Sequence, residues 1–66
     1  MKNRSEIFFE MIRLGNVVKV TAIDAETGIE AVVQGPVSAS PSDLQQLAKN
    51  KLDYLMKKAA GNKDET

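Results

Sequence analysis

The chain has no cysteine, no histidine and no tryptophan among its 66 residues. Disulfide and thiolate chemistry are therefore absent, as are the commonest metal ligand and the commonest general base. The remaining acids and bases are carboxylates, lysines and one tyrosine, and the carboxylates form no pair at a spacing typical of a catalytic site. We accordingly expect a protein that is not an enzyme, with no catalytic residue, no cofactor and no metal.

Net charge and long apolar runs are missing as well. Nine basic and nine acidic residues cancel, so the overall field attracts neither nucleic acid nor an anionic membrane. The polar residues 1–6 precede an apolar run of only three residues, 7–9, which is far shorter than a signal-peptide core or a membrane span. We expect a cytoplasmic protein without membrane contact.

A hydrophobic content of 42% is present and is ordinary for a folded protein. Sixty-six residues fit one domain, which we place at residues 1–61, followed by a disordered tail at 62–66. A domain this small is marginally stable, so a partner or a second copy would help to stabilise it.

Two runs rich in aromatic and branched side chains, 6–14 and 17–23, flank Gly15-Asn16. This pattern predicts a β-hairpin with a type II′ turn, in which Leu14 pairs with Val17. Alternation along the two strands then defines the face that enters the core. That face carries Ile7, Phe9, Met11, Val18, Val20 and Ala22, with Arg13 at its rim.

A second turn is predicted at residues 24–28, and the third strand ends at Gly35-Pro36. A four-residue loop would pair Asp24 with Ile29 and place Ile29, Ala31 and Val33 on the core face. A three-residue loop with a bulge would reverse the two faces. We favour the four-residue loop because it buries the more apolar set.

The clearest local signal is a helix start, with Ser40 as N-cap, Pro41 at the first helical position and Asp43 in the first turn. Gly61 is predicted as the C′ residue. At about 100° per residue, one side of the helix carries the predicted apolar stripe. It consists of Leu44, Leu47, Ala48, Leu52, Leu55 and Ala59, with Tyr54 and Met56 at its flanks.

Together these elements predict an α+β fold of the order β-β-β-α. Three strands form an antiparallel meander in the order 1-2-3, and one C-terminal helix packs on one face. The face covered by the helix is predicted to bear Phe9, Met11, Val18, Val20 and Val33.

The second face of the predicted sheet has more apolar residues than a solvated face needs. Contiguous exposed apolar area often marks a binding surface. The competing interpretation is an ordinary surface, over which Glu10 and Lys19 lie. In addition, the first strand is an edge without internal proline or glycine, to which a peptide or a second copy could add. The candidate interaction residues are Phe8, Ile12, Leu14, Val17, Ile23 and Val32.

The alternative function is weak nucleic-acid binding through Lys19, Lys49 and Lys57. The helix lysines point in different directions at 100° per residue, so they do not form one patch. Complementing the helix dipole and covering apolar surface explain them more simply. We therefore expect a protein partner or a second copy, and not nucleic acid.

Several segments also carry a family resemblance: residues 5–10 (SEIFFE), 12–24 (IRLGNVVKVTAID), 27–28 (TG) and 34–36 (QGP). The chain resembles a family of short, uncharacterised alphaproteobacterial proteins, a domain of unknown function. This resemblance covers most of residues 5–58. It implies one short stand-alone domain, with no activity, cofactor or site to transfer to these residues.

Overall fold

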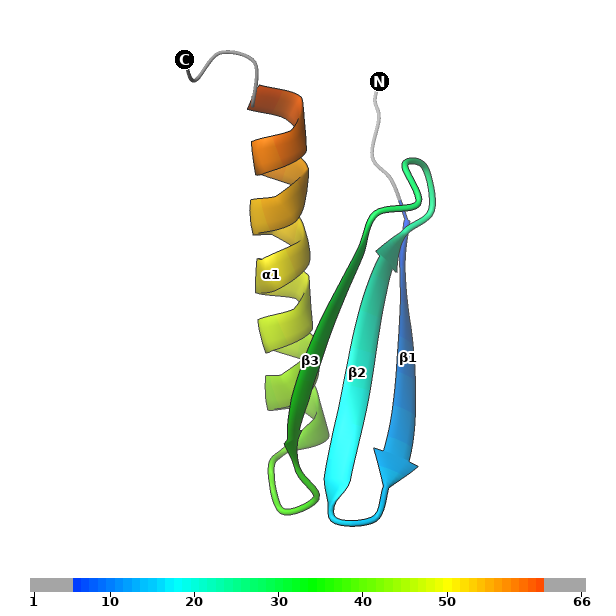
Figure 1. Cartoon of the computed structure of the whole chain (residues 1–66), viewed down its shortest axis with the longest axis vertical. Helices are drawn as coiled ribbons and strands as arrows, with labels where there is room; N and C mark the ends of the chain where they lie inside the picture. The colour runs from blue at the N-terminus through cyan, green and yellow to red at the C-terminus, as the bar shows by residue number, and fades with distance from the viewer. Residues whose placement is uncertain (1–5, 62–66) are drawn as a thin grey trace.

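A computed structural model describes residues 6–61 and contains one sheet and one helix (Figure 1). The strands are β1 (Ile7–Leu14), β2 (Val17–Asp24) and β3 (Glu30–Pro36), and the helix is α1 (Pro41–Gly61). The sheet is antiparallel in the order β1-β2-β3, and α1 packs against β2 and β3. The predicted fold is therefore confirmed, whereas the predicted tail at 62–66 lies outside the described residues.

The first hairpin has the predicted register. Leu14 pairs with Val17 at the turn, and Ile7 pairs with Asp24 at the far end. Gly15 has φ +63°, in the left-handed region that primed hairpin turns require at this position and that glycine adopts without strain.

The loop between β2 and β3 is the four-residue loop. The Asp24 backbone N–H donates to the Ile29 carbonyl at 2.9 Å, and one Asp24 carboxylate oxygen accepts from both the backbone N–H and the hydroxyl of Thr27 at 2.8 Å. Gly28 has φ +78°, as the turn requires. The three-residue alternative is wrong, since a carboxylate that holds the loop backbone favours the longer turn.

The helix begins as predicted and ends differently. The Ser40 carbonyl accepts from the Leu44 N–H at 3.1 Å, and the Ser40 hydroxyl lies 3.4 Å from the Asp43 nitrogen. Gly61 is the last helical residue and has no positive φ. Its assignment as C′ is wrong because glycine adopts helical and left-handed backbone about equally well.

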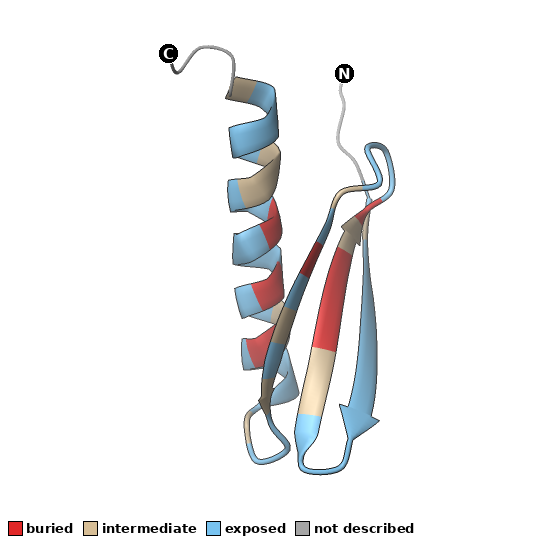
Figure 2. Cartoon of the chain, viewed as in Figure 1, coloured by how far each residue is buried: buried red, intermediate tan, exposed pale blue. Residues whose placement is uncertain are grey.

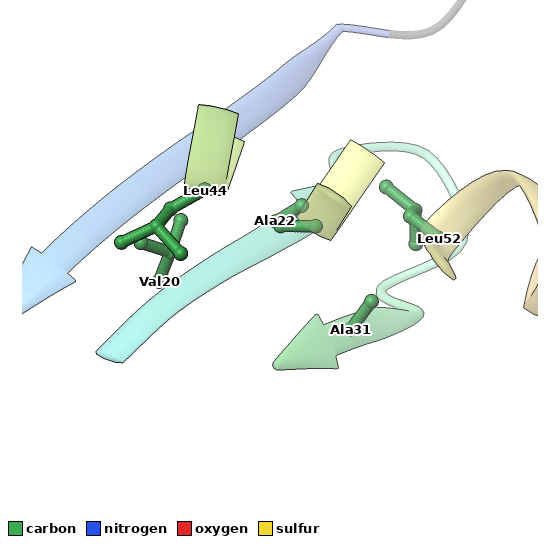
Figure 3. Packing of buried hydrophobic residues seen from close by; sticks show 6 residues of the cluster. Val20, Ala22, Ala31, Leu44 and Leu52 are labelled. Carbon is green, nitrogen blue, oxygen red and sulfur yellow. The ribbon is translucent and has the colours of Figure 1, made fainter. Parts of the chain in front are cut away.

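Small residues let the helix approach the sheet closely. Ala22 and Ala31 of the sheet and Ala48 of the helix are almost fully buried. A Cβ on Gly35 would lie 2.6 Å from Leu44 Cδ2, so glycine leaves the space that this leucine occupies. Figure 3 shows the side chains of this core between the helix and the sheet. The buried hydrophobic residues are Val20, Ala22, Ala31, Leu44, Ala48 and Leu52.

The helix covers two of the three strands, which corrects the predicted core. Phe9 and Met11 lie on the helix side of the sheet, yet 38% and 39% of their surface is exposed. A helix is about 10 Å wide and strands are about 4.8 Å apart. One helix above β2 and β3 therefore leaves β1 open, as the exposure colours show (Figure 2).

The helical stripe is also narrower and shorter than predicted, since Leu47 lies off its side and Ala59 lies toward the C-terminal end of the helix. Leu47 is 54% exposed, and Ala59 is exposed as well. Lys51 shows which flank of the helix is involved, because its ammonium group reaches the Val32 carbonyl of β3. Leu47 precedes Lys51 by one turn and is rotated farther from the core, so it lies beyond the width of the sheet.

Candidate interaction surface

The outer face of the sheet, opposite the helix, carries the predicted interaction residues because successive side chains of a strand point to opposite faces. All six lie on this face, and no segment among residues 6–61 covers it. The exposed fractions are 56% for Phe8, 55% for Leu14, 38% for Ile12, 37% for Val32 and 36% for Val17, whereas Ile23 is half-buried.

The apolar residues of the outer face concentrate toward β1. Leu14 lies opposite Val17 near the turn, and Phe8 lies opposite Ile23 at the other end. In β3 only Val32 is a large apolar residue on this face, with Glu30 and Gln34 on either side. The surface is therefore an apolar band along one edge of the sheet, with a more polar side at β3.

Charged and polar side chains interrupt the band in its middle rows. Ile12 is opposite Lys19, and Glu10 is opposite Thr21, which in turn faces Val32. Thr21 is only 6% exposed, because its neighbours on both outer strands flank it. Little surface at the centre of the outer face is therefore accessible. The accessible apolar surface lies toward the two ends of the strands and along β1.

Strand β1 is exposed on both of its faces. Ile7 is half-buried, and every later residue of the strand is exposed (Figure 2). Phe9 and Met11 extend the apolar surface around the edge to the helix side. The sequence pattern placed these two residues in the core. The small residues Ala22 and Ala31 of β2 and β3 were the signal that the helix lies over those strands, where it can approach closely, and not over β1.

The two edges of the sheet differ in how far they are protected against pairing with another strand. The Lys51 ammonium group donates to the Val32 carbonyl at 2.9 Å, and β3 ends at Pro36. Lysine, proline and a covering helix are devices that keep an edge strand from pairing. Strand β1 has the sequence IFFEMIRL and contains none of these residues, so its edge is the open one.

The lysines of the alternative hypothesis lie on different parts of the molecule. Lys19 is on the outer face of β2, opposite Ile12, whereas Lys49 and Lys57 are on the helix. Lys49 forms an exposed ion pair with Asp53 at 3.1 Å, and Lys58 lies 5.9 Å from the centre of the Tyr54 ring. Lys49 and Lys58 thus engage partners on the helix itself, and the three lysines of the hypothesis are divided between the sheet and the helix.

Two further classes of site are absent from residues 6–61. No three histidine, cysteine, aspartate or glutamate side chains come together there as a metal site would require. In the same part of the chain, no helix is both long enough and apolar enough to cross a membrane. The buried carboxylate of Asp24 serves the loop after β2, where it holds Thr27.

Comparison with protein families finds a match over most of the chain. A family described as "Domain of unknown function (DUF6898)" matches residues 4–59. The chain belongs to this family. Comparisons with curated proteins and with solved structures find no match. Membership in DUF6898 confirms the predicted family resemblance, while the alphaproteobacterial origin stays a prediction.

The DUF6898 match spans the sheet, the helix and the loops between them. It includes every residue of the outer-face band. The family description contains no activity, so the surface of the molecule is what bears on its function.

Proposed function

We propose that this domain is a small non-catalytic module that binds a protein partner or a second copy of itself through the outer face of its sheet. The observation that carries the proposal is the apolar band itself. Phe8 and Leu14 each expose more than half of their surface, and Ile12 lies between them on the same strand. The exposed apolar area is on the order of a few hundred Å², the size at which surface patches on small proteins are often functional.

The size of the domain supports the same proposal. One helix and three strands bury few large side chains. Of the six buried hydrophobic residues in the core, only two are leucines. Apolar burial in so small a domain only roughly balances the conformational entropy of folding. Covering the band would add burial that the monomer lacks, and binding of any kind to the native state stabilises it.

The test replaces one band residue by a charge and compares it with a matched site elsewhere. Phe8→Lys removes a side chain that is 56% exposed, and Leu47→Lys removes one that is 54% exposed on the helix. Sedimentation velocity at about 50 µM, a range suited to an interface of modest area, reports self-association of each variant. Binding of any partner protein is measured with the same pair.

The proposal predicts that Phe8→Lys weakens association at least about 10-fold, the effect of losing about 1.4 kcal/mol of burial. Leu47→Lys should associate as the unmodified chain does. If the unmodified chain and both variants associated equally, the outer face would not be the binding surface. Far-UV circular dichroism should show the same helix and sheet content in both variants, because neither residue is in the core.

The nucleic-acid alternative has less support. Binding through Lys19, Lys49 and Lys57 would require lysines on opposite layers of the molecule to contact one ligand, and one of them is paired with Asp53. If it operates, affinity should fall steeply with salt, in proportion to the phosphates neutralised.

A further inference from the structure

The open edge of β1 has a defined hydrogen-bonding pattern. The Glu6 carbonyl accepts from the Ala25 N–H at 2.9 Å, and Leu14 pairs with Val17 across a two-residue turn. In an antiparallel ladder, hydrogen-bonded pairs alternate with non-bonded pairs. The even-numbered residues of β1 therefore bond to β2. The odd-numbered residues, Ile7, Phe9, Met11 and Arg13, direct their N–H and C=O groups away from the sheet.

We infer that a second copy of this chain adds to this edge, β1 against β1 in antiparallel orientation, with the two-fold axis at Met11. The two sheets then form one continuous six-stranded sheet. This inference rests on the proposed function and deepens it, because it names the partner and the way in which it binds.

Two-fold symmetry makes the strand complementary to itself. An axis perpendicular to the sheet keeps outer face beside outer face and helix side beside helix side. Residues of equal parity then lie opposite each other, so the outward N–H and C=O groups of the odd residues meet. About six new backbone hydrogen bonds can form between the two strands. Several registers satisfy this condition, and the contacts between side chains determine which of them is the most stable.

The charge of Glu10 and the positions of the apolar side chains favour the axis at Met11. An axis at Glu10 would place the two Glu10 carboxylates opposite each other, which destabilises a strand pair. An axis at Met11 sets Glu10 beside Ile12 of the second copy. It also sets Phe8 opposite Leu14 of the second copy, and these are the two most exposed apolar residues of β1.

The neighbouring registers fit less well. An axis at Phe9 would leave Leu14 beyond the paired segment, and an axis at Ile12 would set Phe8 opposite the turn. The Met11 register instead pairs the whole of residues 8–14. On the helix side it places Arg13, whose Nε donates to the Gly15 carbonyl at 3.0 Å, opposite Phe9 of the second copy.

The exposed apolar area of β1 sets an upper limit on what the dimer can bury. Five large apolar side chains of β1 expose 38–56% of their surface, which amounts to about 450 Å² per copy if a large side chain has about 200 Å². Even if the second copy covered all of it, the total of about 900 Å² would lie in the range of weak or transient association. Stacking two outer faces would bury Phe8 and Leu14 but would leave Phe9, Met11 and the open edge exposed.

The absence of cysteine provides a direct test. At the two-fold axis the two Met11 residues form a hydrogen-bonded pair with Cα atoms about 5.5 Å apart, within the range of a disulfide. In a Met11→Cys variant, two thiols lose two electrons and two protons to an added mild oxidant, diamide, and form one intermolecular disulfide. Leu47→Cys, an exposed residue of the helix, measures crosslinking by random collision.

The inference predicts that Met11→Cys crosslinks at least 10-fold faster than Leu47→Cys at micromolar concentration. Equal rates would overturn it. This test does not depend on a disruptive substitution, and reduction of the disulfide should restore the starting protein.

Sedimentation separates the inference from the proposed function. Met11→Pro removes an N–H that points away from β2, a position at which an edge strand tolerates proline. We expect it to abolish the dimer, whereas Phe8→Lys should weaken association at least about 10-fold. If Phe8→Lys weakened association while Met11→Pro did not, edge pairing would be wrong and binding through the outer face would stand. A chain that is monomeric at about 100 µM would overturn self-pairing, because association would then contribute less than about 5.5 kcal/mol.

Discussion

The β3 edge of the sheet is protected by Lys51, Pro36 and the neighbouring helix, whereas β1 carries only the charged residues Glu10 and Arg13 and lies beyond the two strands on which the helix packs. Lys51 donates directly to a β3 carbonyl, so a strand that approached β3 would have to displace it. Strand β1 instead presents apolar side chains on both faces beside unpaired backbone groups. Native sheets protect their edges when pairing is harmful. The proposed pairing therefore depends on the β1 edge, the less protected of the two.

The largest expected effect lies in the covered half of the molecule. Leu52 is fully buried, and Leu52→Ala should lower the free energy of unfolding by about 3 kcal/mol, through lost burial and the cavity left behind. Urea unfolding at fixed protein concentration, followed by circular dichroism, measures this loss. A loss below about 1 kcal/mol would mean that the helix does not stabilise β2 and β3 as described.

The next largest loss of stability is expected from the loop that joins β2 to β3. Asp24 is 1% exposed and accepts two hydrogen bonds from Thr27, so Asp24→Ala should cost about 2 kcal/mol. Thr27→Val is the matched control, because it removes the hydroxyl and keeps the backbone donor, and it should cost about 1 kcal/mol. The same urea experiment ranks them. The reverse order would show that the carboxylate does not hold the loop.

Removing Lys51, one of the three features that protect β3, should make its edge more like that of β1. Lys51→Met keeps a long side chain but deletes the donor to Val32, with a stability loss of about 1 kcal/mol or less. Its larger consequence should appear in sedimentation, as species larger than a dimer, because both edges can then pair. Lys57→Met, at another exposed helix lysine, should not change the sedimentation profile. Identical profiles for both variants would mean that Lys51 does not protect the edge.

The smallest effect is expected in β1. Phe9→Ala, which replaces a side chain that is 38% exposed, should lower the monomer's stability by about 1 kcal/mol or less, since partly exposed residues contribute little to the core. Urea unfolding at about 1 µM limits the contribution of association. A loss equal to that of Leu52→Ala would mean that β1 belongs to the covered half after all.

Local signals account for the parts of the fold that were predicted correctly. Glycine at position 15 and the run of Asp24 to Gly28 specify their turns through backbone conformation and through a carboxylate that bonds to the loop. Ser40 and Pro41 specify the helix start in the same local way. Each turn sets a register, and alternation then assigns every residue of a strand to a face.

Local signals and alternation could not predict which strands the helix lies over. Phe9 and Met11 share a face with Val20 and Ala22, so alternation treats all four alike. Their exposure differs because the helix lies over the small residues of β2 and β3. The same placement leaves Leu47 outside the core and brings Lys51 to the β3 edge, which a helical pattern by itself does not reveal.

By itself, the sequence determined the order of the elements, the turns, the strand registers and the two faces of the sheet. These depend on neighbouring residues and on a period of two along each strand. Only the tertiary structure decided which two strands the helix covers, and therefore which edge is closed and which large side chains stay exposed. That choice depends on contacts between residues distant in sequence, such as Gly35 with Leu44 and Val32 with Lys51, because a helix is narrower than three strands.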